Sequence, residues 1–233
     1  GLDLVFPHHE NEKAQSEACS GHQFVRYWMH HNLLEFGGQK MSKSLGNIMK
    51  ARDFIREYDG ETLKFMMLKN HYRSTIDFSD DEIDRAIHSL ARFYSALAFA
   101  KELIGLEAPL APIPESFQKV LDRVQRKFNE SMDDDFNTAE ALAQMFELVR
   151  AFNHEVRKPN FKPEHKAIAE AFYHLFLDKG ACLSLFQEPS IEFLKGLDVR
   201  LLQKKGFERQ NIDQLVTERI QARTDKNWNR ADE

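Results

Sequence analysis

Residues 39–47 read Gln-Lys-Met-Ser-Lys-Ser-Leu-Gly-Asn, a short polar stretch that we call the lysine loop. Its two lysines can place positive charge on a polyphosphate, and its two serine hydroxyls supply directed hydrogen-bond donors. Gly37, Gly38 and Gly46 leave the backbone free to open and close. This composition favours a phosphate-binding loop, although a solvated surface turn would have the same composition. The residues that we assign to the phosphate site are Lys40, Met41, Ser42, Lys43 and Ser44.

The composition indicates a folded protein from a reducing compartment. The chain has 233 residues, of which 42 % are apolar and 30 % are charged, enough for one large or two modest domains. No apolar run reaches the roughly 18 residues needed to cross a bilayer, which excludes a membrane-spanning protein. The two cysteines, Cys19 and Cys182, cannot form a disulfide framework. We therefore expect a cytoplasmic protein without a membrane partner.

The net charge of −5 neither supports nor excludes an RNA partner, because phosphate contacts need a basic face and not a basic protein. Acidic residues are concentrated between 80 and 190, whereas the tail from Lys204 to Arg230 is locally basic. A basic stretch that contains one tryptophan, Trp228, can stack an unpaired base and hold backbone phosphates. An exposed charged helix in which Trp228 is the packing residue is the alternative.

The first twenty residues combine a short apolar run with a helix-forming segment. Residues 2–6 predict the end of a buried strand, and Pro7 suits the first turn of the helix that follows. On that helix His8 and Glu12 stand four residues apart, so that an imidazole nitrogen and a carboxylate on one face could bind one zinc ion. Two ligands do not complete a tetrahedral site, and Cys19 is about 10 Å further along the axis. A solvated or hydrogen-bonded His–Glu pair is the alternative.

Aromatic residues follow, and then two short helices. Residues 27–30, Tyr-Trp-Met-His, read as a short strand or a helix end whose aromatic side chains pack in the core. Short amphipathic helices are predicted at 51–58 and 61–68, separated by Asp59–Gly60.

From Ser79 onward the sequence predicts four amphipathic helices. Ser79 and Glu82 have the spacing of a capping box, which marks the start of the first helix. The third helix is predicted to have Asn137 or Thr138 as its N-cap, and the fourth to end before Gly180. Four such helices with short connections predict an antiparallel bundle whose apolar stripes form the core. The stretches in which apolar side chains recur at helical spacing are 83–104, 117–128, 142–156 and 168–176.

Four separated strings resemble the cysteinyl-tRNA synthetases, a family of class I aminoacyl-tRNA synthetases. Lys-Met-Ser-Lys-Ser looks like the signature loop of class I, and the segment around His8 and Glu12 resembles the zinc-binding segment of the family. Asp-Asp-Phe-Asn-Thr recurs in these enzymes, and Arg-x-x-Lys-x-Trp-x-x-Ala-Asp resembles their tail. The four strings, in the order of the family, occupy residues 3–16, 40–44, 134–138 and 223–232.

The stretch 71–74, His-Tyr-Arg-Ser, also resembles the family. Because Lys64 and Lys69 are close in sequence, the inside of a bent tRNA could lie against this region. A plain structural connection is equally compatible. The acidic run 133–135 could suggest a metal site, but helix capping and the resemblance favour a structural role.

The resemblance implies a mostly α chain that is the C-terminal portion of such a synthetase. Residues 1–78 would be the end of a class I Rossmann-type α/β catalytic domain, with the lysine loop and connecting helices. Residues 79–190 would be the antiparallel helical bundle, and residues 191–233 the truncated start of a small anticodon-binding domain. The chain begins at Gly1 without a methionine, so we expect the upstream nucleotide-binding half to lie outside it.

The resemblance also implies roles for individual residues. His8 and Glu12 would join two upstream cysteines around one Zn²⁺ ion per subunit, which binds the thiolate of the substrate and rejects serine without an editing site. His9 would lie near the substrate. Lys43, supported by Lys40, would stabilise the charge that develops on pyrophosphate. The residues expected at the anticodon are Arg223, Trp228 and Asp232.

These expectations together describe activation of L-cysteine with ATP and its transfer to tRNA(Cys) in translation. We expect a monomer, and we expect the 233-residue chain alone to be inactive because the family's other nucleotide motif, His-Ile-Gly-His, is absent from it. Two alternatives stay open. A related ligase that joins cysteine to an amino sugar would share the zinc and lysine-loop chemistry but has no anticodon to read. A non-catalytic helical RNA-binding module would have no need of His8, Glu12 and Lys43.

Overall fold

The computed structural model describes residues 1–41, 49–109, 111–156 and 161–232. The described chain is mostly helical, as predicted, and it divides into two compact units, residues 1–190 and residues 191–233. Residues 42–48 of the lysine loop lie outside the described ranges. None of the helices in these ranges is both long enough and apolar enough to cross a membrane.

The N-terminal segment is helical from its second residue. Its elements are a 3₁₀ turn η1 (Leu2–Leu4), a π-type turn η2 (Val5–His9) and the helix α1 (Glu10–Ser20). The prediction of a buried strand at 2–6 is wrong, because Leu2 and Phe6 are exposed and no strand of the described residues pairs with this stretch. The Leu2 amide donates to the carbonyl oxygen of His31 at 3.1 Å. This backbone hydrogen bond is not part of a β-sheet.

A small sheet leads into the lysine loop. Its strands are β1 (Leu34–Phe36), β2 (Gln39–Lys40) and β3 (Ile76–Asp77), in the order β2-β1-β3. β1 and β2 are antiparallel, and Gly37 and Gly38 join them with φ values of 59° and 75°, which glycine adopts without strain. β3 pairs in parallel with β1, and Asp77 Oδ1 accepts from the Gly37 amide at 2.9 Å. The lysine loop therefore leaves the sheet from a hairpin whose turn is fixed.

Two short helices follow the lysine loop, as predicted. They are α2 (Ala51–Glu57) and α3 (Gly60–Leu68). The Asp59 carboxylate caps α3, since it accepts from the Thr62 amide at 2.5 Å and from the Thr62 hydroxyl at 2.7 Å. Phe54 and Phe65 are buried, so both helices turn an apolar face inward.

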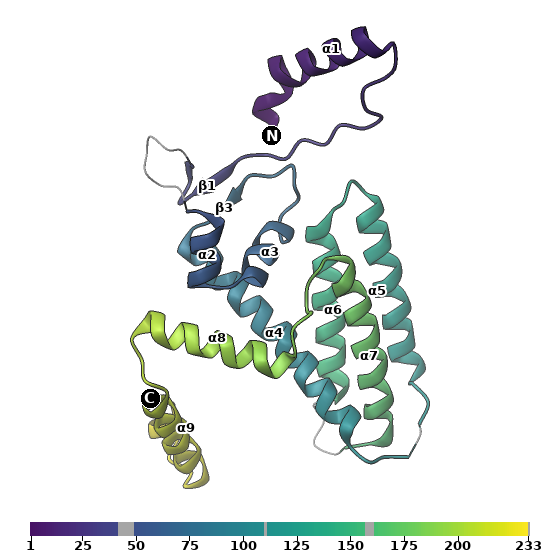
Figure 1. Cartoon of the computed structure of the whole chain (residues 1–233). Coiled ribbons are helices and arrows are strands. Elements are labelled where there is room, and N and C mark those ends of the chain that lie inside the picture. Colours follow the sequence, from purple (N-terminus) through teal and green to yellow (C-terminus); the bar gives the residue numbers. More distant parts are fainter. Residues whose placement is uncertain (42–48, 110, 157–160, 233) are drawn as a thin grey trace. The chain divides into compact units, whose positions relative to one another are not determined.

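Four long helices form the bundle that the sequence predicts. In Figure 1 they lie side by side as α4 (Asp80–Gly105), α5 (Glu115–Asp133), α6 (Thr138–Val156) and α7 (Pro163–Cys182). Phenylalanine rings fill the core. The Phe152 and Phe172 rings stack with their centroids 4.1 Å apart, and those of Phe93 and Phe176 lie 5.4 Å apart. Each fully buried ring contributes roughly 1.5–3 kcal/mol, so the apolar stripes are the core of the bundle.

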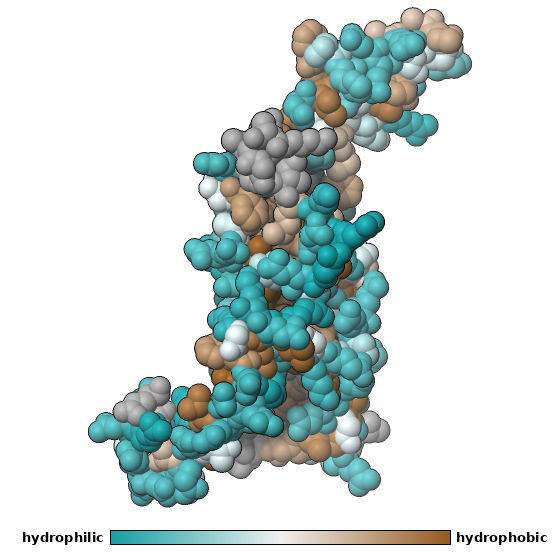
Figure 2. Space-filling model, turned by 60° about the vertical axis from the view of Figure 1, so that its left-hand side comes forward, coloured by the Kyte–Doolittle hydropathy of each residue, from teal (hydrophilic) through white to brown (hydrophobic). Residues whose placement is uncertain are grey.

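The surface carries both kinds of side chain. Figure 2 shows hydrophilic side chains over much of the displayed face, with hydrophobic side chains gathered in patches between them. This distribution is what amphipathic helices produce when their apolar stripes turn inward.

The capping box predicted for α4 is half right. Ser79 is the N-cap residue, but its side chain makes no capping hydrogen bond. The predicted partner, Glu82, forms ion pairs with Lys69 and Arg85 instead. Because the Glu82 carboxylate is drawn toward the end of α3, it joins two helices rather than capping one.

Helix α7 runs to Cys182, so the prediction that it ends before Gly180 is wrong. Gly180 is buried, and a Cβ atom added there would lie 2.7 Å from Cδ2 of Phe186 and 3.2 Å from the carbonyl oxygen of Leu185. The loop after the helix folds back onto it, with positive φ values of 54° at Ser184 and 61° at Phe186. The glycine therefore allows a close approach of the loop and does not terminate the helix.

We expect Gly180→Ala to destabilise the protein by about 1–3 kcal/mol, because the new methyl group has no space beside the Phe186 ring. Gly105→Ala is the matched control, since Gly105 also lies in a helix and a Cβ there meets nothing within 4 Å. In the control, the better helix propensity of alanine should be neutral or stabilise by up to ~1 kcal/mol. Urea unfolding of both variants checks the prediction, and equal midpoints would contradict it.

The second unit is built from three helices within its described residues. They are α8 (Ser190–Lys205), α9 (Arg209–Thr224) and α10 (Trp228–Asp232). A Schellman motif ends α8, because Gly206 has a φ of 67° and the Phe207 amide donates to the carbonyl oxygen of Leu202 at 3.0 Å. Glu218 on α9 pairs with Arg230 on α10 at 3.0 Å, which holds the last short helix against α9.

Candidate functional site

His8 and Glu12 face each other where α1 begins. His8 Nε2 lies 3.4 Å from Glu12 Oε1, and both side chains are about half exposed, so the predicted contact across one helical turn is present. Two ligands of a tetrahedral zinc ion with bonds of about 2.0–2.1 Å are about 3.3 Å apart, which matches this separation. No cluster of three or more His, Cys, Asp or Glu that could hold a metal occurs in the part of the chain that the structure describes. The pair could therefore supply two ligands of a four-ligand site.

His9 lies in a cluster of aromatic rings beside this pair. Its Nδ1 atom is 2.9 Å from Nε2 of His30, and the indole of Trp28 stacks on both imidazoles, at 5.2 Å from His9 and 5.7 Å from His30. Desolvation and the neighbouring charge of His9 lower the pKa of His30. The two imidazoles are within hydrogen-bonding distance of each other.

The sequence did not predict this cluster. The expectation that residues 27–30 pack in the core is wrong, because Tyr27 is 88 % exposed and Met29 is 56 % exposed. The segment is extended, and its alternate residues, Trp28 and His30, share one face. That alternation was the available signal, but nothing local indicates that His9 lies opposite.

Only the start of the lysine loop can be placed. The Lys40 backbone belongs to β2 and pairs with Glu35, and the Met41 amide donates to the carbonyl oxygen of Leu34 at 3.2 Å. The three remaining residues assigned to phosphate binding, Ser42, Lys43 and Ser44, lie outside the described residues.

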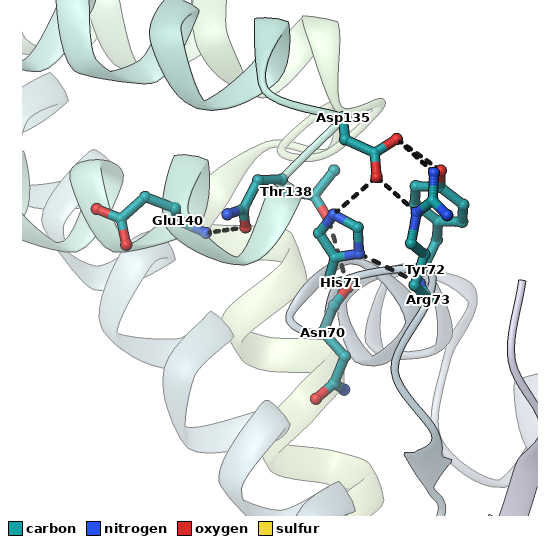
Figure 3. A network of polar contacts seen from close by, with 8 residues as sticks. Asn70, His71, Tyr72, Arg73, Asp135, Thr138 and Glu140 are labelled. Atoms are coloured by element: carbon teal, nitrogen blue, oxygen red, sulfur yellow. Dashed lines mark hydrogen bonds and ion pairs between the residues drawn. The ribbon is translucent and has the colours of Figure 1, made fainter.

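Asp135, in the turn between α5 and α6, connects the bundle with the segment that follows α3 (Figure 3). Its carboxylate accepts from Tyr72 Oη at 2.6 Å and from Arg73 Nε at 2.6 Å, and it lies 3.9 Å from His71 Nε2. The bonds to Arg73 and Tyr72 lower the pKa of Asp135, so this carboxylate stays ionised. The nearby Asn137, one of the two predicted caps of α6, accepts from the Glu140 amide at 3.1 Å. Asp135, the last residue of the acidic run, thus has the structural role that the sequence favoured.

An apolar hollow of about 420 Å³ lies beneath this network. It is bounded by β1, β3, the end of α3 and the turn between α5 and α6, and Leu34, Ile76, Tyr72 and Phe136 line it. Phe136 is 53 % exposed. The ring of Phe136 therefore gains little burial of its own.

The two lysines near residues 71–74 are engaged with the protein. Lys64 Nζ donates to the carbonyl oxygen of Ser184 at 2.8 Å, and Lys69 pairs with Glu82. These contacts favour the structural connection over a lysine surface that is free for RNA.

Glu61 is a buried carboxylate at the start of α3. It is 7 % exposed, and it accepts from Tyr94 Oη at 2.8 Å and from the Phe186 amide at 2.7 Å. It therefore ties α3 to α4 and to the loop after α7. Burial raises the pKa of Glu61 above its ordinary value, and the two donors oppose this effect only in part.

We expect the stability difference between the parent and Glu61→Gln to depend on pH. Because the pKa of Glu61 is raised by folding, the folded state binds its proton more tightly than the unfolded state does. The parent therefore loses stability relative to the variant as pH rises from the ordinary glutamate pKa through the raised one. Urea midpoints of both proteins between about pH 4.5 and pH 8 check this, since groups common to both cancel in the difference. A difference that stays constant over this range would contradict the prediction.

The three tail residues assigned to the anticodon are all exposed. Arg223 lies in the last turn of α9, whereas Trp228 and Asp232 lie on α10. Trp228 is 58 % exposed, which favours an unfilled stacking surface over the alternative of a packing residue. Asp232 lines a hollow of about 420 Å³ together with Leu215, Arg219 and Arg230.

Comparisons with known proteins agree with the resemblance. The family model described as the tRNA synthetases class I (C) catalytic domain matches residues 1–88, and the DALR domain model matches residues 127–187. The chain is 47 % identical to a cysteine–tRNA ligase of Bdellovibrio bacteriovorus, 40 % identical to one of Syntrophotalea carbinolica and 40 % identical to one of Geobacter sulfurreducens. Each similarity covers all of this chain and 48 % of the relative. The chain thus spans about half the length of the curated relatives that it matches.

Proposed function

Because this chain belongs to the class I tRNA synthetases and is similar throughout to cysteine–tRNA ligases, we propose that the whole protein is a cysteine–tRNA ligase. It would activate L-cysteine with ATP and transfer the aminoacyl group to tRNA(Cys). The observation that carries the proposal is the similarity over every part of the chain, at up to 47 % identity.

The His8–Glu12 pair supports the choice of cysteine as substrate. Its nitrogen and oxygen donors and their 3.4 Å separation fit half of a zinc site, with the other ligands expected upstream of this chain. When bound, zinc would offer a position that a soft thiolate fills better than a hydroxyl, which separates cysteine from serine. His9 and His30, which contact each other beside the pair, would hold the imidazoles near the substrate in fixed orientations.

The lysine loop would handle the triphosphate of ATP. Lys43, with Lys40 in support, would offset the negative charge that grows on pyrophosphate as the cysteine carboxylate attacks the α-phosphate. Because loop closure would form this contact mainly in the transition state, it would raise kcat more than it lowers KM. The β1–β2 hairpin gives the loop a fixed base, which supports this role.

The helical remainder of the chain would serve the tRNA. We assign residues 1–78 to the catalytic domain, 79–190 to the bundle and 191–233 to an anticodon-binding segment. Exposed Trp228 supports base stacking in that last segment, with Arg223 and Asp232 as the groups that contact the anticodon. We also propose that the protein is a cytoplasmic monomer, which size-exclusion chromatography with light scattering would check.

The test is ATP–pyrophosphate exchange by the whole protein with cysteine and with serine, followed by charging of tRNA(Cys). The proposal requires exchange with cysteine, strong rejection of serine and transfer to tRNA. Exchange without charging would indicate the ligase that joins cysteine to an amino sugar. Absence of exchange together with tRNA binding would indicate a non-catalytic RNA-binding module. Either result would overturn the proposal.

A further inference from the structure

The turn that presents Asp135 has an uncommon backbone. Asp135 and the next residue, Phe136, have φ values of 53° and 54°, in the left-handed region that bulky residues rarely adopt. Aspartate tolerates this conformation, whereas for phenylalanine it is strained, and the Phe136 ring is 53 % exposed. The result of the turn is that the Asp135 carboxylate reaches Tyr72 and Arg73, as Figure 3 shows.

The residues that Asp135 holds are bonded in turn to Asn32, which lies just before β1. The Asn32 amide donates to the carbonyl oxygen of Tyr72 at 3.0 Å, and the Asn32 side-chain amide donates to that of Arg73 at 3.0 Å. Asn32 Oδ1 then accepts from the Leu33 amide at 2.9 Å. Both polar atoms of the Asn32 side chain, Nδ2 and Oδ1, therefore form hydrogen bonds that fix the backbone just before β1.

Asn32 lies between the two candidate site elements. Two residues before it is His30, whose ring contacts His9 at 2.9 Å. After it, β1 continues into the Gly37–Gly38 turn and the lysine loop. A displacement of Asn32 would thus move the histidine pair and the base of the lysine loop together.

An apolar hollow lies beside this connection. The 420 Å³ hollow lies between β1 and the turn of Asp135, and its walls include the rings of Tyr72 and Phe136. Among the described residues, a long hydrogen bond from Thr138 Oγ1 to the carbonyl oxygen of Asn70, at 3.4 Å, also joins the two sides. Asp135 therefore adds a polar connection across the hollow to the direct pairing of β1 with β3, in which the Ile76 amide donates to the carbonyl oxygen of Leu33 at 3.2 Å.

We infer that Asp135 is a positioning residue for cysteine activation, which acts through Arg73, Tyr72 and Asn32 to hold the histidine pair and the β1–β2 hairpin in their working arrangement. This inference rests on the proposed function, because the step that it serves is the activation of cysteine. The Asp135 side chain is 41 % exposed and that of Arg73 is 58 % exposed. Exposed ion pairs contribute little to global stability, so Asp135 should affect positioning more than folding.

The experiment compares Asp135→Ala and Asp135→Asn with Asp134→Ala in the whole protein. Asp134 is the matched control, an exposed neighbour whose side chain has no hydrogen bond or ion pair within the described ranges. We expect Asp135→Ala to lower the kcat of cysteine-dependent exchange about 10-fold, with KM for cysteine and the Tm close to the parent. Asp135→Asn, which keeps one acceptor oxygen, should recover part of the loss. In a double-mutant cycle, Arg73→Ala should add little to Asp135→Ala.

Amide hydrogen exchange supplies a readout that does not depend on activity. Loss of Asp135 should speed exchange in peptides that cover residues 30–36, as well as in 71–74. Faster exchange in 71–74 alone, or a kcat loss equal to that of Asp134→Ala, would overturn the inference. If the parent protein shows no cysteine-dependent exchange, the proposed function fails, and Asp135 has no activation step to serve. Unchanged hydrogen exchange at 30–36 in an active parent overturns the inference alone.

Discussion

Lys43→Ala in the whole protein should lower the kcat of cysteine-dependent ATP–pyrophosphate exchange about 100- to 1,000-fold, the usual loss when one charge-stabilising group is removed. The KM for cysteine should stay within about twofold of the parent, because the lysine would act on charge that appears only in the transition state. Steady-state exchange at varied cysteine and ATP checks both numbers.

Lys50→Ala is the control for this variant. Lys50 is an exposed lysine at the N-cap of α2, outside the residues assigned to phosphate binding, and its loss should leave kcat within about twofold. If Lys43→Ala kept the parental kcat, or lost no more than the control, the role of the lysine loop would have to be abandoned.

His8→Ala in the whole protein should remove most of the bound zinc and lower kcat/KM for cysteine by more than about 100-fold. The reason is the loss of a nitrogen donor from a pair whose 3.4 Å separation suits one shared ion. Metal analysis of the purified protein gives the first result, and exchange assays with cysteine and serine give the second. The preference for cysteine over serine should fall with the zinc content.

Glu10→Gln is the matched control, because Glu10 is an exposed acidic residue at the start of α1, two residues from His8, and is not one of the assigned ligands. It should keep its zinc and its rate. Full zinc occupancy in His8→Ala would refute the assignment of His8 as a ligand, whatever the effect on the rate.

Local sequence patterns predicted the helices correctly. The predictions failed where the structure depends on contacts outside the local pattern. The bundle helices follow from apolar spacing within each helix, and the His8–Glu12 contact follows from one helical turn. By contrast, the glycine signal predicts a helix end at Gly180, whereas the structure uses this glycine to admit the Phe186 ring, a contact that helical spacing does not indicate. The stretch 2–6 was read as a buried strand because its apolar composition does not tell whether a partner strand is present.

The same distinction holds for the candidate site. His9 and His30 are 21 residues apart, and Arg73 and Asp135 are 62 apart, so neither contact has a local signature. Each of these residues also fits a solvated surface when it is read alone. Composition and spacing therefore indicated two candidate metal ligands, His8 and Glu12, and the phosphate-binding loop. They did not indicate the contacts that would hold these residues in place.

The pairing of α4 with α7 has a consequence for synthesis on the ribosome. The Phe93 ring on α4 lies 5.4 Å from that of Phe176, and the Phe152 ring on α6 stacks on Phe172 at 4.1 Å, so each ring is only partly packed until α7 is in place. Roughly two dozen residues separate the end of α6 from the end of α7, which corresponds to about 1–5 s of translation. During this interval the nascent bundle exposes aromatic side chains. Chaperones that bind exposed aromatic surface can therefore bind the chain until α7 packs against the other helices.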